Sequence, residues 1–313
     1  MTKSTWRVVT VVVAWSIVSI IPAVAQDLGV PCMDCDETCE AICPGFIAGA
    51  EMVILRPYAS DPKNLTISNG EETFSLTQPD NSFDICPRFW LGYVGSRGLG
   101  ARARYFKFDH GLDAESLLLE TTENTPIFGT DLRITGAGGL TVYAVDVEAF
   151  QQVALGQWNA SFGGGVRAGG LGRTFAFAVE PLDEPIQSAE LSKEFDGVGP
   201  TVFAEFHRPL GCRGLALVAN VRGSVLFGQE RLGIAGTGDE LLGLSASEKH
   251  DAIVGVGEIQ LGGEWTRPLD CGGNLLVNAL WEGQIWSGSG AILDVISNDV
   301  GLIGCSIGVG MVR

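Results

Sequence analysis

The sequence lacks the signatures of several common protein classes. It has no G-x-x-x-x-G-K-[ST] phosphate loop, no H-E-x-x-H zinc motif and no G-x-S-x-G nucleophile turn. Three histidines are too few for a histidine-rich metal site. Lysine and arginine number 20 against 37 aspartates and glutamates, a formal charge of −17. Because so acidic a chain repels phosphate, nucleic acid is excluded as a partner. We predict no cofactor, no metal and no enzymatic activity.

Long apolar runs are also scarce, and the one present lies at the start. Residues 8–24 carry no charge and follow Lys3 and Arg7. An A-x-A cleavage signal lies at the end of this run, at 23–25. We therefore expect residues 1–25 to be a signal peptide that is removed on export, and not a single membrane-spanning helix. No later run approaches the ~18 apolar residues that a transmembrane helix requires.

What the sequence does have is alternation with period two. From Leu215 to Phe227 apolar side chains alternate with Asn220, Arg222 and Ser224, which is typical of a strand with one apolar and one polar face. With 43 glycines and 46% hydrophobic residues, the composition suits neither a helical protein nor a disordered one. Similar segments predict ten strands, at 45–58, 83–95, 98–109, 138–152, 155–169, 194–208, 213–228, 250–266, 272–287 and 299–312.

The spacing of these strands favours a membrane barrel. Most exceed the ~9–11 residues that cross a bilayer at a tilt. Short connections alternate with long ones, which is typical of periplasmic turns and outer loops. We predict an all-β fold in which 45–313 form a single antiparallel membrane-spanning β-barrel in the Gram-negative outer membrane. The strand-like segment Thr174–Glu180 lies in the expected loop 170–193, and it either lengthens its neighbours or adds a hairpin that gives twelve strands.

Export makes disulfide bonds between the cysteines permissible. Four of them, Cys32, Cys35, Cys39 and Cys43, precede the first strand in a Cys-rich segment at 26–44 that we place in the periplasm. A disulfide-tied knot is the favoured interpretation, and a zinc site or metal cluster is the alternative. Two further candidates for a disulfide fall in short turns that share the pattern E-aromatic-x-R-P-L-x-C-x-G. They are Cys212 and Cys271.

Three segments resemble a known family. They are GFIAGAEMVILRPY at 45–58, CPRFWLGYVGSRGLGARARYFKFD at 86–109 and VDVEAFQ at 145–151. Together they resemble the Legionella-type major outer-membrane proteins, a pore-forming family. The resemblance implies a β-barrel and a porin-like role. It runs in chain order from about residue 45 to the end, and the Cys-rich segment lies outside it.

Charged residues of both signs fall on the polar face of the expected strands. In a membrane barrel this face turns inward, so we predict that nine residues line the lumen: Glu51, Arg102, Arg104, Asp146, Glu148, Arg167, Arg222, Glu258 and Glu282. Arg102 and Arg104 are expected to pair with Asp146 and Glu148 across neighbouring strands. Trp158, Trp265, Trp286 and Tyr58 are interpreted as residues of the membrane–water boundary.

Three functions remain open at this point. The first, and the one that we predict, is a porin-like passive channel that admits small polar solutes or ions through a narrow charged lumen. The second is a plugged barrel that tethers the envelope, with the Cys-rich segment as its periplasmic link. The third is an outer-membrane protease that uses Asp109-His110 and His250-Asp251. The expected partners are outer-membrane lipid and the barrel assembly machinery, and association into homo-oligomers stays open.

Overall fold

The computed structural model describes most of the expected barrel. The residues that it describes are 44–58, 65–68, 73–76, 82–119, 132–181, 187–211, 213–237, 245–269, 273–288 and 299–312. They form strands and tight turns. Among them, no helix is both long enough and apolar enough to span a membrane.

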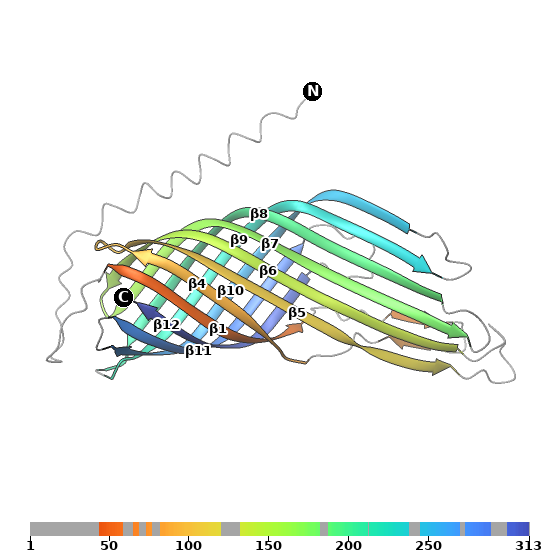
Figure 1. The fold of residues 1–313 in the computed structure, drawn as a ribbon, viewed down its shortest axis with the longest axis horizontal. Helices are drawn as coiled ribbons and strands as arrows, with labels where there is room; N and C mark the ends of the chain where they lie inside the picture. Colours follow the sequence, from red (N-terminus) through yellow and green to blue (C-terminus); the bar gives the residue numbers. More distant parts are fainter. Residues whose placement is uncertain are drawn as a thin grey trace, which may run out of the picture.

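Ten strands form one closed barrel (Figure 1). Each strand of the barrel pairs antiparallel with its neighbours in the chain, and β1 closes the sheet by pairing with both β4 and β12. The prediction of a ten-stranded antiparallel barrel is confirmed. The strands are β1 (Gly45–Tyr58), β4 (Asp84–Val94), β5 (Leu99–Leu119), β6 (Leu132–Leu155), β7 (Trp158–Pro181), β8 (Gln187–Pro209), β9 (Leu215–Thr237), β10 (Ser245–Pro268), β11 (Asn274–Gly288) and β12 (Asp299–Val312).

The twelve-stranded alternative is wrong for the barrel. Thr174–Glu180 continues β7 and forms no additional hairpin. Two further strands, β2 (Leu65–Ser68) and β3 (Thr73–Leu76), pair only with each other in a separate two-stranded sheet.

One end of the barrel carries the tight turns, together with the start of β1 and the end of β12. Gly45 at the start of β1 lies opposite Val94, and Ile47 lies opposite Val312 at the end of β12. The turn from β4 to β5 is closed by hydrogen bonds between Gly95, Gly98 and Leu99, and Gly98 has a φ of 75° that favours glycine. In an outer-membrane barrel the end with short turns faces the periplasm.

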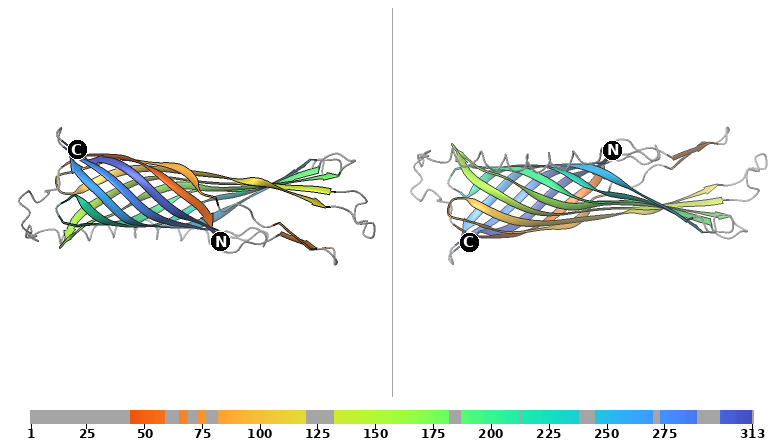
Figure 2. Two further views of the ribbon diagram at one scale, coloured as in Figure 1. Left: turned by 90° about the horizontal axis from the view of Figure 1, so that it is seen from below. Right: turned by 90° about the horizontal axis from the view of Figure 1, so that it is seen from above.

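The strands differ in length more than the sequence predicted. The six strands β5 to β10 have 21–24 residues, whereas β1, β4, β11 and β12 have 11–15. The long strands continue past the barrel as a twisted sheet (Figure 2). The expected strand ends at 109, 138, 169, 194, 228 and 250 were wrong. The sequence prediction ended each strand where the apolar alternation stops. In water a strand continues through its backbone hydrogen bonds without that alternation.

The outer face of the barrel carries an apolar belt. On β9 the outward residues from Leu215 to Phe227 include Leu217, Val221 and Val225, each 43–50% exposed. Twelve residues at ~3.3 Å each span roughly 40 Å along the strand, or about 30 Å along the barrel axis at a tilt of ~40°. This height matches the hydrocarbon thickness of a bilayer. The belt therefore marks the membrane-embedded part of the wall.

Candidate functional site: the barrel interior

The inner face of the wall is divided into three layers. On β6, reading from the short-turn end, Phe150 comes first, Glu148 and Asp146 follow, and Val142 and Leu140 lie beyond them. The same order recurs on β1 and β4. An apolar cluster of Val94, Phe150 and Phe203, with Ile47 packed against it, therefore lies below a charged layer. A larger apolar cluster of sixteen buried residues lies above it, toward the long connections.

The charged layer is centred on shared contacts between five arginines and six carboxylates. On β4, Arg88 donates from Nη1 to Glu51 Oε2 at 2.8 Å and to Glu282 Oε2 at 2.9 Å, and its Nη2 also pairs with Glu282. The guanidinium carbon lies 5.0 Å from the ring centre of Phe106. The side chains of Arg88 and Glu282 are 1% and 0% exposed, so both charged groups of this pair are shielded from water.

Neutral amides complete the surroundings of Glu282. Gln260 Nε2 donates to its Oε2 at 2.9 Å, and Gln284 Nε2 donates to its Oε1 at 2.6 Å. Asn220 in turn donates to Gln260 at 3.1 Å. A buried carboxylate is tolerated only when its lone pairs are satisfied, and Glu282 meets that condition through three strands.

A second centre lies nearer the short-turn end. Arg102 Nε donates to Glu148 Oε2 at 2.8 Å, and its two Nη atoms form a fork to Glu205 at 2.9 and 2.5 Å. The guanidinium stacks against Phe203, with 4.3 Å from its carbon to the ring centre, and Phe150 lies on a longer approach of 5.6 Å. This arginine therefore joins the charged layer to the lower apolar cluster.

The middle of the layer is a mesh and not a set of separate pairs. Arg167 donates from Nε to Asp146 Oδ1 at 2.6 Å, and its Nη1 lies 2.5 Å from Glu258. Arg222 contacts Glu148 at 3.0 Å and reaches Asp146 and Glu258 at 3.8 and 3.7 Å. Each carboxylate in the mesh thus serves more than one arginine, so loss of one side chain disturbs several contacts.

Glycine allows the backbones of neighbouring strands to approach closely beside these large side chains. Across neighbouring strands, Gly165 lies opposite Glu148 and Gly199 lies opposite Arg167. A Cβ at Gly165 would come within 1.9 Å of the backbone oxygen of Val147, which a real side chain cannot do. Gly308 is different, because a Cβ there would lie 2.7 Å from Cγ of Glu51, the residue opposite it. Part of the glycine content therefore serves close strand packing, and Gly308 also leaves space for a charged side chain.

The charged layer leaves almost no surface for water. Within the layer, Arg88, Asp146, Glu148, Arg167 and Glu282 are each 0–2% exposed, and the side chains of the other six charged members are 6–17% exposed. A side chain that lines an aqueous channel must keep surface that a water molecule can touch, and the first five do not. In the described conformation the interior is consequently filled by side chains at this level.

The structure brings the sequence-predicted lumen residues together. All nine lie on the inner face, and Arg102 and Arg104 approach Glu148 and Asp146 at 2.8 and 3.8 Å. Their role as the lining of an open pore stays a prediction. The residues are Glu51, Arg102, Arg104, Asp146, Glu148, Arg167, Arg222, Glu258 and Glu282.

Sequence reasoning missed two central members of the layer, Arg88 and Glu205. Arg88 lies between Pro87 and Phe89, which are both exposed on the outer face. The alternation that identified Arg102 also places Arg88 inward, so the signal was present. The sequence could not show that Arg88 contacts Glu282, because the two residues are 194 positions apart in the chain.

Other expectations about single residues were wrong. Trp286 does not lie at the membrane boundary, because it is 0% exposed inside the upper apolar cluster, with Nε1 directed to Gln284 Oε1 at 3.2 Å. Its neighbour Ile285 faces outward, and period two therefore turns Trp286 inward. Trp265 and Tyr58 are 37% and 60% exposed. Two apolar clusters also lie inside the barrel, below and above the charged residues that the sequence predicted.

The histidine pairs proposed for a protease are not formed. Asp109 is exposed and His110 is buried, because adjacent strand residues face opposite sides. His110 Nδ1 instead lies 2.5 Å from Asp84 Oδ2, and His250 Nε2 lies 3.4 Å from Glu230. Neither histidine contacts the aspartate that follows or precedes it.

The predicted cysteine pairs lie outside the described residues. This holds for Cys32, Cys35, Cys39, Cys43, Cys212 and Cys271. Of the turns that hold the last two, the flanking residues Gly214 and Thr266 are joined by a backbone hydrogen bond of 2.7 Å. Among the described cysteines, Cys86 is buried in the upper cluster, Cys305 is exposed on the outer face, and both are free thiols.

Comparison with known proteins gives one extensive match. A family model described as the Legionella pneumophila major outer membrane protein precursor matches residues 39–311. No curated protein matches the chain.

Solved structures resemble the chain only weakly. The toluene transporter TbuX of Ralstonia pickettii has a TM-score of 0.24 and 8% identity, and the match covers 86% of this chain and 89% of that one. The toluene transporter TodX of P. putida has a TM-score of 0.22 and 10% identity, with 86% and 89% covered. The translocator domain of the autotransporter NalP from Neisseria meningitidis has a TM-score of 0.21 and 14% identity, with 97% of both chains covered.

Proposed function

Since the chain belongs to the family of the Legionella pneumophila major outer membrane protein, we propose that it is an outer-membrane barrel with a lumen closed at rest. Its role in this proposal is structural. The barrel links the outer membrane to the rest of the cell envelope, and its long strands form a β-sheet outside the membrane. The observation that carries the proposal is the filled interior, in which the charged layer is sealed between two apolar clusters.

Each layer opposes permeation for a different reason. The charged layer offers fixed counter-charges within 2.5–3.0 Å of each other, so an entering ion must replace a desolvated ion pair. The upper cluster contains Trp286, Phe108 and Leu226, which are all 0% exposed. An apolar constriction expels water even when it is wide enough to admit it. An eight-stranded barrel is filled by side chains and open channels appear at ~16–18 strands, so ten strands are consistent with closure.

The six long strands supply a surface for the structural role. Beyond the apolar belt, outward residues become polar, as Lys107 and Asp109 do on β5 and Asp196 does on β8. A sheet that continues on the side away from the short turns lies outside the cell in this orientation. The Cys-rich segment at 26–44 would supply the link on the periplasmic side.

A second candidate is the porin-like channel for small polar solutes or ions. One observation favours it: the charged layer contains shared contacts, such as Asp146 with Arg104, Arg167 and Arg222. Because each carboxylate already has an alternative partner, the layer could exchange partners and open a polar path. The excess of six carboxylates over five arginines in this layer would favour cations over anions.

Conductance in planar bilayers separates the two candidates. For a barrel closed at rest, the wild type gives no steady current in concentrated KCl at either polarity. The double variant Trp286→Ala, Phe108→Ala removes two buried rings from the upper cluster, and it should give transient openings. Trp281→Ala is the matched control because Trp281 is 45% exposed on the outer face, and it should be silent. A steady, cation-selective current from the wild type would overturn the closed barrel and establish the channel.

A further inference from the structure

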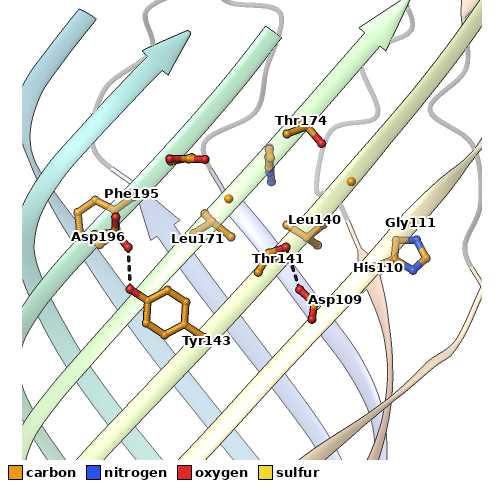
Figure 3. Close-up of a pocket in the computed structure, with 14 residues that line it drawn as sticks. Asp109, His110, Gly111, Leu140, Thr141, Tyr143, Leu171, Thr174, Phe195 and Asp196 are labelled. Atoms are coloured by element: carbon orange, nitrogen blue, oxygen red, sulfur yellow. Dashed lines mark hydrogen bonds between the residues drawn. The ribbon is translucent and has the colours of Figure 1, made fainter. Parts of the chain in front are cut away.

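The outer face of the wall has a groove of mixed polar and apolar lining at the upper border of the apolar belt. It has a volume of about 480 Å³ and lies across β5, β6, β7 and β8 (Figure 3). Just toward the short-turn end, Tyr105, Val145 and Val198 are exposed members of the belt. The groove therefore lies where the headgroups of the outer leaflet begin.

Three glycines form the floor of this groove. Gly111 on β5 is paired with Gly139 on β6, and Gly172 on β7 lies opposite Thr141 on β6. A Cβ added at Gly111 would meet nothing within 4 Å, and one at Gly172 would meet only the Thr141 Cβ at 3.8 Å. The backbone does not require glycine at either position. What glycine supplies is the hollow itself.

The rim carries hydrogen-bonding groups that are already oriented. Tyr143 donates to Asp196 Oδ1 at 2.6 Å, and Thr141 donates to Asp109 Oδ1 at 3.0 Å (Figure 3). The hydrogen bond to Asp196 raises the pKa of Tyr143 to about 12, so the phenol remains a neutral donor. Both carboxylates are about half exposed, and their remaining lone pairs face solvent.

The charges of the rim are largely balanced. Lys107 lies 2.7 Å from Asp109, and Arg231 lies 3.7 Å from Asp196. Within the described part of the chain, no group of three acidic, histidine or cysteine residues is arranged to hold a metal ion. Paired carboxylates are poor sites for a bare cation, and they repel a bare phosphate. They remain good acceptors for hydroxyl groups, and the Tyr143 ring adds a flat apolar surface.

We propose that this groove binds a saccharide, namely a sugar unit of an outer-leaflet glycolipid. A sugar offers several hydroxyl donors to the carboxylates, and its apolar ring face fits against Tyr143. The height of the groove directly above the belt favours a sugar that is attached to a lipid anchor. This inference needs the barrel to lie in the outer membrane, but it holds for a closed or an open lumen.

The glycine floor gives a specific test. Gly172→Val places a side chain in the groove without meeting backbone, whereas Gly255→Val places the same side chain on the outer face of β10, where a Cβ meets nothing within 4 Å. Both variants and the wild type are purified, stripped of lipid, and titrated with an uncharged glycolipid, a long-chain alkyl maltotrioside, and with the free oligosaccharide maltotriose. We expect Gly172→Val to weaken glycolipid binding at least tenfold and Gly255→Val to leave it unchanged.

The remaining outcomes are also decisive. Tyr143→Phe should weaken binding severalfold, because it removes the hydroxyl that orients Asp196. If Gly172→Val weakens binding of the free oligosaccharide as well, the sugar itself is recognised. If only the free oligosaccharide binds, the saccharide site stands and its ligand is soluble. Absence of wild-type binding to both probes, or equal binding by Gly172→Val and Gly255→Val, would overturn the proposal.

Discussion

Removal of Arg88 should destabilise the barrel more than any substitution on its surface. In Arg88→Met the side chain keeps most of its volume against Phe106 but loses its contacts to Glu51 and Glu282. Glu282 is 0% exposed, so its charge cannot recover hydration. Truncating one partner of a buried ion pair typically costs ~3–5 kcal/mol, because the other charge is left without compensation. We expect the free energy of unfolding to fall by about this amount.

The measurement is urea unfolding of the barrel in lipid vesicles, followed by tryptophan fluorescence. The double variant Arg88→Met, Glu282→Gln should cost less than the sum of its single variants, because the second change removes the orphaned charge. Lys107→Met is the control: its pair with Asp109 is about half exposed on both sides, and no measurable change is expected. A loss below about 1 kcal/mol for Arg88→Met would show that the interior is hydrated, and would refute the sealed layer.

Two further predictions concern the packing of the interior and the orientation of the wall. Gly199→Ala places a Cβ 1.8 Å from Val225 O and should lower the free energy of unfolding by ~1–3 kcal/mol in the same assay, whereas Gly255→Ala should be neutral. In single-tryptophan variants, lipids brominated on their acyl chains should quench Trp281, which is 45% exposed, and not Trp286, which is 0% exposed. Equal quenching of the two would contradict the inward orientation of Trp286.

The sequence was sufficient for the architecture of the barrel. Period two identifies each strand, and the number of strands and their antiparallel order follow from alternating connections. The bounds of β1 (Gly45–Tyr58) and β12 (Asp299–Val312) agree with the prediction to the residue. The upper ends of the long strands were missed because lipid contact, which produces the apolar pattern, ends before the hydrogen-bonded ladder does.

The candidate site was only half predictable. The alternation of side chains along a strand places Arg102 and Glu148 inward, but alternation alone does not show whether the lumen is empty or filled by side chains. That depends on the combined size of side chains from strands that are not adjacent, as in the contact of Arg88 on β4 with Glu282 on β11. The inward position of Trp286 was overlooked because tryptophan near a strand end is common at membrane boundaries, although alternation with the outward-facing Ile285 turns it inward.

The pairing of Gly308 with Glu51 across two strands links the evolution of the two positions. A Cβ at Gly308 would lie 2.7 Å from Glu51 Cγ, so this position can gain volume only if Glu51 becomes smaller. At Gly165 and Gly199 the obstacle is the backbone of the next strand, so there glycine is expected to persist whatever residue faces it. The outer face has no such restriction, because fluid lipid adapts to whatever shape it meets.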